Sequence, residues 1–186
     1  MIRLAVLLSG RGSNFAAIHQ AIVRRELGAQ IVAVISNRAD APGIARAREW
    51  GYDAHVIDNR DFPNRTAHEQ AIVRVLDSAK PDYIVLAGYM RLLSPSFVAK
   101  YRGRILNIHP SLLPAFPGVD AQAQAIAAGA RTSGCTVHFV DEGLDSGPVI
   151  LQREVDVRDD DTVETLSARI LEQEHIAYVE ALKKLT

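Results

Sequence analysis

The stretch Leu4-Ala5-Val6-Leu7-Leu8-Ser9-Gly10-Arg11-Gly12-Ser13-Asn14 decides the fold of this chain. Its first five residues form a continuous apolar run, which is typical of a strand buried on both faces of a parallel sheet. A polar turn with two glycines follows, and Phe15, Ile18, Ile22 and Val23 then recur at helical spacing. Strand, turn and helix in this order predict the first βα unit of a layered α/β sheet.

The same alternation continues along the chain and predicts a Rossmann-like α/β fold, with a mostly parallel, twisted sheet and helices on both faces. The predicted strands span residues 4–8, 31–36, 54–57, 83–86, 104–109, 136–140 and 149–155. The predicted helices are a first one that ends near Leu27, then 44–50, 65–79 and 121–128, and a last one capped by Asp161 or Thr162. No repeat or linker interrupts the pattern, so we expect one domain over residues 1–186.

Composition excludes several classes of protein. The net charge of −1 over 186 residues does not favour nucleic acid or an acidic membrane as a partner. No apolar run approaches the ~20 residues needed to span a bilayer, and the strand pattern starts too early for a signal peptide. The single cysteine, Cys135, excludes an intramolecular disulfide. A cytoplasmic enzyme fits this composition, and so does a cytoplasmic binding protein.

The turn Ser9–Asn14 is suited to an anion, because free N–H groups at a helix start attract negative charge. Its glycines allow close approach of a ligand, and Ser13 and Asn14 offer further side-chain donors. The turn is not a dinucleotide-binding motif, since Phe15 occupies the third glycine position, and it lacks the Gly-Lys-Ser/Thr of a P-loop. It predicts a site for a single phosphate, and a capped turn without a ligand is the alternative.

A second polar-apolar segment, residues 87–95, follows the predicted strand 83–86. Met90, Leu92 and Leu93 suit the lining of an apolar pocket, and in doubly wound sheets ligands bind beyond the carboxyl ends of strands. The alternative is that these side chains are ordinary core and that Arg91 is a surface charge.

A third segment pairs a carboxamide with an imidazole. On a strand over 104–109, alternation places Asn107 and His109 on one face. Such a pair polarises a carbonyl and moves a proton. The acidic loop 140–148 offers Asp141, Glu142 and Asp145 as partners for the imidazole, and the residues alone do not choose among them or exclude a solvated loop.

Together these segments closely resemble the phosphoribosylglycinamide formyltransferase family, the folate-dependent enzymes of purine biosynthesis. The matching segments, in order, are 9–14, 85–91, 107–114, 136–140, 145–150 and 173–175. Each motif alone is modest, but their order and spacing are specific. The resemblance implies the formyltransferase fold. It also implies transfer of the formyl group of 10-formyltetrahydrofolate to the amine of glycinamide ribonucleotide, which gives formylglycinamide ribonucleotide and tetrahydrofolate without a metal.

The resemblance also implies roles for individual residues. The implied catalytic residues are Asn107, His109 and Asp145. The implied ribonucleotide site is Gly12, Ser13, Asn14 and Glu174. The implied folate site is Arg65, Met90, Arg91, Leu92, Leu93, Asn107, Val140 and Asp141. In this assignment the N-terminal half binds the ribonucleotide phosphate, and the C-terminal half binds folate and carries the catalytic residues.

Residues 115–122 depart from the family pattern, because many members have histidines in a basic or aromatic stretch there and this chain has none. His138 matches the family, and we expect it to be a buried, hydrogen-bonded histidine more than a catalytic one.

The alternative functions are hydrolysis of formyltetrahydrofolate, formylation of methionyl-tRNA, and a non-catalytic module that binds phosphate or folate. The hydrolase family adds an N-terminal regulatory domain and the tRNA family a C-terminal RNA-binding domain, and we expect neither here. No nucleic acid or membrane partner is expected, and the patterns leave monomer and homodimer open.

Overall fold

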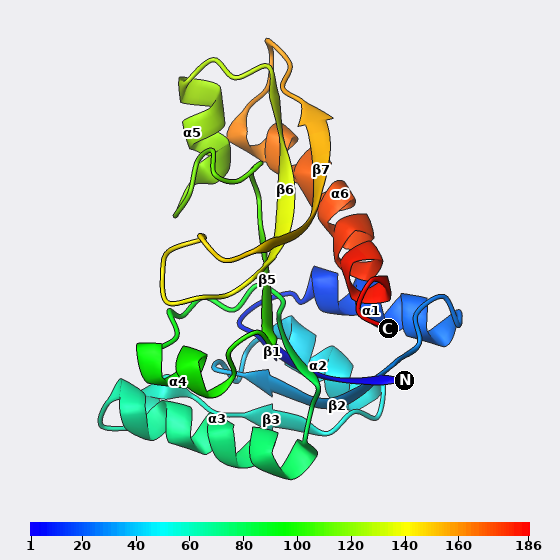
Figure 1. The fold of residues 1–186 in the computed structure, drawn as a ribbon, viewed down its shortest axis with the longest axis vertical. Helices are drawn as coiled ribbons and strands as arrows, with labels where there is room; N and C mark the ends of the chain where they lie inside the picture. Colours follow the sequence, from blue (N-terminus) through cyan, green and yellow to red (C-terminus); the bar gives the residue numbers. More distant parts are fainter.

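The computed structural model describes residues 1–186, and its centre is one seven-stranded sheet (Figure 1). The strands are β1 Ile2–Leu8, β2 Ala29–Ser36, β3 Ala54–Val56, β4 Tyr83–Leu86, β5 Ile105–His109, β6 Thr132–Phe139 and β7 Val149–Asp156. Their order across the sheet is β3-β2-β1-β4-β5-β6-β7. The pairs among β1 to β5 are parallel, whereas β6 is antiparallel to β5 and to β7. The predicted mostly parallel α/β sheet is confirmed.

Helices cover both faces of this sheet. They are α1 Ser13–Val23, α2 Pro42–Glu49, α3 Arg65–Ala79, α4 Pro95–Lys100, α5 Ala121–Ala127 and α6 Val163–Lys183, with a short 3₁₀ turn at Asn59–Asp61. Helices α1, α2, α5 and α6 share one hydrophobic core, and α3 and α4 share a second. Helix α6 packs along β6 and β7 and against α1 (Figure 1). None of the helices has the length and apolar character that crossing a bilayer requires.

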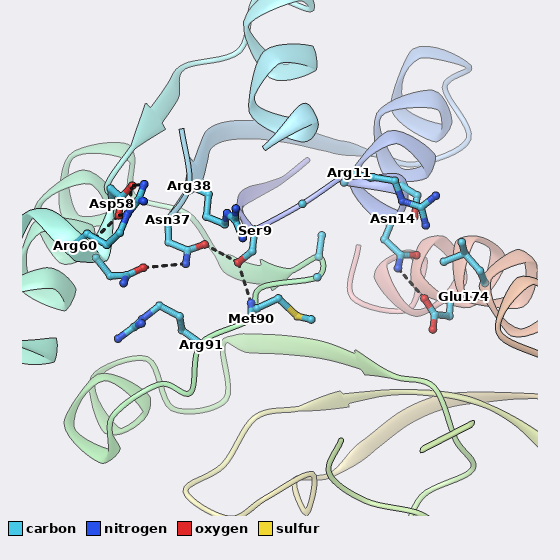
Figure 2. Close-up of a pocket in the computed structure, with 17 residues that line it drawn as sticks. Ser9, Arg11, Asn14, Asn37, Arg38, Asp58, Arg60, Met90, Arg91 and Glu174 are labelled. Carbon is cyan, nitrogen blue, oxygen red and sulfur yellow. Dashed lines mark hydrogen bonds and ion pairs between the residues drawn. The ribbon is translucent and has the colours of Figure 1, made fainter. Parts of the chain in front are cut away.

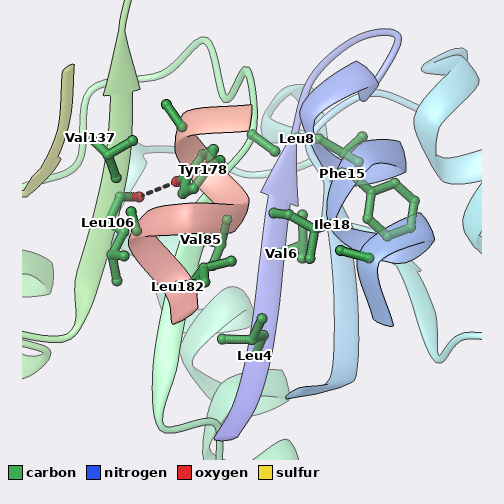
Figure 3. Packing of buried hydrophobic residues seen from close by; sticks show 14 of the residues in the cluster. Leu4, Val6, Leu8, Phe15, Ile18, Val85, Leu106, Val137, Tyr178 and Leu182 are labelled. Atoms are coloured by element: carbon green, nitrogen blue, oxygen red, sulfur yellow. Dashed lines mark hydrogen bonds between the residues drawn. The ribbon is translucent and has the colours of Figure 1, made fainter. Parts of the chain in front are cut away.

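Strand β1 is buried on both faces, which explains its unbroken apolar run. Leu4, Val6 and Leu8 point into the core that contains α1 and α6 (Figure 3). Ala5 and Leu7 point into the opposite core with α3 and α4. Because side chains alternate along a strand, no position in this stretch reaches water before Ser9. The first polar side chain after this apolar run, that of Ser9, therefore lies at the carboxyl end of the central strand.

A buried tyrosine ties α6 to the ends of two neighbouring strands. The Tyr178 hydroxyl donates to the backbone oxygen of Leu86 at 2.9 Å. It also donates to the backbone oxygen of Leu106 at 3.0 Å (Figure 3). Burial raises the pKa of Tyr178 well above its ordinary value, so the hydroxyl remains a donor. This contact fixes the backbone of β5 one residue before Asn107.

Several boundaries differ from the sequence prediction by one to four residues, and one helix was not predicted. Helix α1 ends at Val23 and not near Leu27, because Arg25 has a φ of 60° and turns the chain away from the helix. Helix α4 was not predicted, although its start carries a signal. The Ser94 hydroxyl accepts from the N–H of Phe97, and Pro95 stands at the first helical position.

The structure also defines where β6 begins and which residue caps the start of α6. Strand β6 begins at Thr132, four residues before its predicted start at 136. Of the two candidate caps of the last helix, Thr162 is the one used, since its hydroxyl accepts from the N–H of Thr165. The apolar pattern of β6 starts late because its first three residues, Thr132, Ser133 and Gly134, are not apolar, although the second and third are buried.

We predict that Tyr178→Phe lowers the free energy of unfolding by about 1–3 kcal/mol, because it leaves two buried carbonyl oxygens without this donor. Urea unfolding followed by circular dichroism measures the change. Tyr83→Phe, on the half-buried tyrosine at the start of β4, is the matched control and should change stability by less than about 0.5 kcal/mol. Equal stability of wild type and Tyr178→Phe would show that the hydrogen bonds of the Tyr178 hydroxyl do not stabilise the fold.

Candidate active site

The carboxyl ends of β1, β4 and β5 lie side by side, since these strands are adjacent and parallel. The turn after β1, the segment after β4 and the end of β5 therefore meet at one edge of the sheet, as predicted. Two cavities open there, with volumes of about 660 Å³ and 330 Å³. Arg91 lines both of them, so the cavities are neighbours.

The first cavity contains the whole implied ribonucleotide site. Gly12, Ser13, Asn14 and Glu174 all line it (Figure 2). The first turn of α1 has no side-chain cap, so its N–H groups are free for an anion.

The turn over this first cavity requires glycine at two positions. Gly12 has a φ of 67°, which a side chain rarely adopts, and a Cβ there would lie 3.1 Å from Gly43 Cα. A Cβ on Gly43, at the start of α2, would lie 2.9 Å from the Leu8 side chain and 3.0 Å from the Gly10 oxygen. The turn between β1 and α1 is therefore packed directly against the start of α2.

A buried polar pair closes one end of the first cavity. Asn14 Nδ2 donates to Glu174 Oε2 at 3.0 Å, and the two residues come from α1 and α6 (Figure 2). Burial raises the pKa of Glu174, while the bond from Asn14 acts in the opposite direction. Asn14 Oδ1 is buried without a hydrogen-bond partner in the protein.

The second cavity contains most of the implied folate site. The implied residues that line it are Arg65, Arg91, Leu92, Leu93, Asn107, Val140 and Asp141. Met90 is the exception, because it lines the first cavity, where its side chain is largely exposed. Leucine and valine side chains beside two arginines suit a flat apolar ligand that carries negative charge at one end.

The three implied catalytic residues lie close together, but not all of them line a cavity. Asn107 and Asp145 line the second cavity, whereas His109 is buried and lines neither. His109 Nδ1 lies 3.5 Å from Asp145 Oδ2, and its Nε2 lies 2.8 Å from the backbone oxygen of Phe116. Both ring nitrogens thus face oxygen atoms, an arrangement that suits an imidazolium with two N–H donors.

The acidic loop presents one of its three carboxylates to the imidazole. Asp141 accepts from the Gly143 N–H and the Ser146 hydroxyl, at 2.9 and 2.8 Å. Glu142 forms an ion pair with Arg102 at 2.9 Å. Asp145, whose φ of 50° is unusual for a residue with a side chain, is the one that faces His109.

The loop of residues 115–122, which contains no histidine, holds His109 and Asp145 through its backbone. The Phe116 oxygen contacts His109, and the Gly118 N–H donates to Asp145 Oδ2 at 2.8 Å. Sequence reasoning missed both groups, because a backbone contact leaves no residue-type signal.

His138 is also part of the second cavity. It pairs with Asn107 across β5 and β6, and its Nδ1 lies 3.0 Å from the Phe139 oxygen. Its Nε2 is buried without a partner and lies 4.0 Å from Asp145 Oδ1. Burial lowers the pKa of His138 and so favours a neutral ring. The expected burial is confirmed, and one ring nitrogen faces the site.

Several residues of the first cavity were not predicted. They are Asn37, Arg38, Asp58, Asn59 and Arg60. Their signal was positional, since Asn37 directly follows β2 and Asp58 follows β3 at the same sheet edge. No group of three or more histidine, cysteine, aspartate or glutamate side chains is arranged to hold a metal ion.

The sequence and fold of this chain have counterparts among known proteins. The model of a family described as formyl transferase matches residues 2–182, and the chain belongs to this family. Phosphoribosylglycinamide formyltransferase of Escherichia coli (strain K12) is 45% identical over 177 residues, covering 95% of this chain and 84% of that protein. A crystal structure of phosphoribosylglycinamide formyltransferase from Brucella melitensis matches with a TM-score of 0.94 and 50% identity, over 99% of this chain and 95% of that one.

Longer proteins contain a related segment. The trifunctional purine biosynthetic protein adenosine-3 of Drosophila pseudoobscura pseudoobscura is 49% identical over 185 residues. The match covers 98% of this chain and only 14% of that protein. The family that the motifs predicted is confirmed by these comparisons.

We predict that Glu174→Gln makes the protein more stable than wild type, by an amount that grows as pH rises. The folded state holds the Glu174 proton more tightly than the unfolded chain, so the wild type loses stability as pH rises above 4.5 and through the raised pKa. Glutamine stays neutral and can still accept from Asn14. Urea unfolding at pH 4 and pH 8 measures the difference, which should vanish at the lower pH.

The control is Glu172→Gln, an exposed glutamate on the same helix. Its effect on the free energy of unfolding should remain within about 0.5 kcal/mol at pH 8. A loss of stability in Glu174→Gln at pH 8 would show that the buried carboxylate stabilises the fold.

Proposed function

We propose that this chain transfers the formyl group of 10-formyltetrahydrofolate to the amine of glycinamide ribonucleotide, a step of purine biosynthesis. The observation that carries the proposal is the meeting of two cavities at Arg91, because a two-substrate transfer requires both ligands beside the same reacting groups. The names of the relatives support it. All the proposed site residues belong to one sheet, its loops and the helices that flank it, which supports a single domain that acts on small molecules.

In this proposal the first cavity holds the ribonucleotide. Its phosphate binds the free N–H groups at Gly12, Ser13 and Asn14, as anions do at helix starts. The buried pair of Asn14 and Glu174 then faces the ribose, whose hydroxyls are both donors and acceptors.

The folate occupies the second cavity. Its flat pterin packs among apolar side chains that include Leu92, Leu93 and Val140, and its glutamyl carboxylates face Arg65 and Arg91. This places the formyl-bearing nitrogen, which lies between pterin and glutamate, along the stretch lined by Asn107 and Asp145. In this arrangement the reacting carbon lies beside Asn107 and Asp145.

The reaction is an acyl transfer. The amine nitrogen attacks the formyl carbon and forms a tetrahedral intermediate, in which the formyl oxygen carries negative charge. The bond from carbon to folate N10 then breaks, the amine loses a proton, and N10 gains one. We assign to the Asn107 carboxamide a hydrogen bond to the developing oxyanion, a kind of contact whose loss raises a barrier by about 3–4 kcal/mol.

His109 and Asp145 form the charged part of the site. An imidazolium at His109 stabilises the oxyanion, and Asp145 orients the ring and relays the amine's proton through water. Direct donation from Nε2 requires its bond to the Phe116 oxygen to break, since that bond occupies the nitrogen. We expect the chain to act in the cytoplasm, as a monomer or a homodimer.

One assay tests the function. Purified protein is mixed with 10-formyltetrahydrofolate, and tetrahydrofolate release is followed with and without glycinamide ribonucleotide. Release that depends on the ribonucleotide supports the proposal. Equal release without it indicates hydrolysis, release that depends only on methionyl-tRNA indicates the tRNA reaction, and the absence of any release overturns the enzymatic function.

We predict that His109→Ala lowers kcat by at least about 100-fold, the usual scale for loss of an acid-base group, with little effect on ribonucleotide affinity. Steady-state kinetics and calorimetric titration with the ribonucleotide measure the two effects. His55→Ala is the control, since His55 lies on β3 and lines neither cavity. Full activity of His109→Ala would remove His109 from the mechanism.

We predict that Asn14→Ala raises KM for the ribonucleotide about tenfold and leaves KM for the folate nearly unchanged, because the lost contacts are in the first cavity alone. The two constants are measured by varying one substrate at saturation of the other. An equal rise of both constants would contradict a separate ribonucleotide site.

A further inference from the structure

Ser9 lies where the turn after β1 contacts the segment 87–95 after β4. The reaction described above gives Ser9 no role. It ends the apolar run of β1 and is 6% exposed. Its Oγ donates to Asn37 Oδ1 at 2.5 Å and accepts from the Met90 N–H at 2.9 Å (Figure 2). Asn37 Nδ2 in turn donates to Asn59 Oδ1 at 3.1 Å. A chain of hydrogen bonds therefore crosses from β3 to the loop after β4.

The contact with Met90 is the one that reaches both cavities. The Met90 N–H has no hydrogen-bond partner other than Ser9 Oγ. Met90 lines the first cavity, and Arg91, its neighbour, lines both. The position of this short backbone segment thus determines where the shared arginine stands.

The other side of Ser9 leads directly into the phosphate turn. Gly10 and Gly12 follow it, and the Gly10 oxygen is held by the Gly43 N–H at 3.0 Å. The Ser9 N–H also donates to the Gly88 oxygen at 3.1 Å. The backbone and the side chain of Ser9 therefore both bind the segment after β4, which contains Gly88 and Met90. A ligand that orders the turn after Ser9 therefore also restrains Met90.

We propose that Ser9 is a positioning residue that couples the two substrate sites. An occupied phosphate turn fixes Ser9, and the hydroxyl of Ser9 fixes the Met90–Arg91 segment in the form that binds the second ligand. By linkage, the second ligand must favour the first by the same factor. The identity of the two ligands rests on the proposed function, whereas the contact itself does not.

The hydroxyl is the feature to test. Ser9→Ala leaves the buried Asn37 Oδ1 and the Met90 N–H without their partner, whereas Ser9→Thr keeps an oxygen at the same position. Ser133→Ala is the matched control, because Ser133 is a buried serine near the start of β6 whose hydroxyl has no hydrogen-bond partner. It should leave activity and both affinities unchanged.

The first measurement is the Kd of tetrahydrofolate, by calorimetry, with and without glycinamide ribonucleotide, two ligands that do not react together. We expect the ribonucleotide to tighten tetrahydrofolate binding about fivefold or more in wild type, Ser9→Thr and Ser133→Ala, and less than twofold in Ser9→Ala. A merely structural role would weaken both affinities and keep their ratio. An unchanged ratio in Ser9→Ala, or no tightening in wild type, overturns the coupling.

The second measurement separates this inference from the proposed function. Hydrogen exchange of the Met90 amide is followed with and without inorganic phosphate. Phosphate should slow exchange at least about threefold in wild type and have no effect in Ser9→Ala. Lack of this protection in wild type overturns the coupling. Protection in a protein that releases no tetrahydrofolate supports the coupling and overturns only the proposed function.

Discussion

Burial of β1 on both faces is the constraint on which the rest of the structure depends. A strand with cores on both sides satisfies its backbone only through neighbouring strands, here β2 and β4, and both run parallel to it. Parallel neighbours need crossover helices, which must cover the two faces. All the connecting turns after β1, β4 and β5 then fall at one sheet edge. The polar residues that bind and react are thus collected by the same requirement that buries Leu4 and Leu7.

The reactive groups are held by a mixture of side chains and backbone. Asn107 takes its place from strand alternation, since Leu106 and Ile108 pack into the core on the other face. His109 and Asp145 depend on the Phe116 oxygen and the Gly118 N–H. Because these are backbone groups, the loop 115–122 can differ in side chains from the family pattern and still hold the pair. The absence of histidines in this loop is therefore compatible with the geometry of the site.

Much of this arrangement could be predicted from the residues, and the remainder has identifiable physical reasons. Strand burial and the shared face of Asn107 and His109 follow from periodicity. The choice of Asp145 among three carboxylates does not, because it depends on a loop in which Asp145 has a positive φ. The burial of Glu174 has no local signal either, because it results from the packing of α6 on α1. Contacts between distant segments leave no local pattern.

The close approach of Gly12 and Gly43 has a consequence for how such a protein can be recombined. The phosphate turn belongs to the first βα unit, but its shape also depends on close packing against Gly43, at the start of α2 in the second unit. The two units are therefore not interchangeable parts. A chimera that kept residues 1–28 and borrowed the next strand and helix from another sheet would retain the turn's shape only if the donor also supplied a residue without a side chain at position 43.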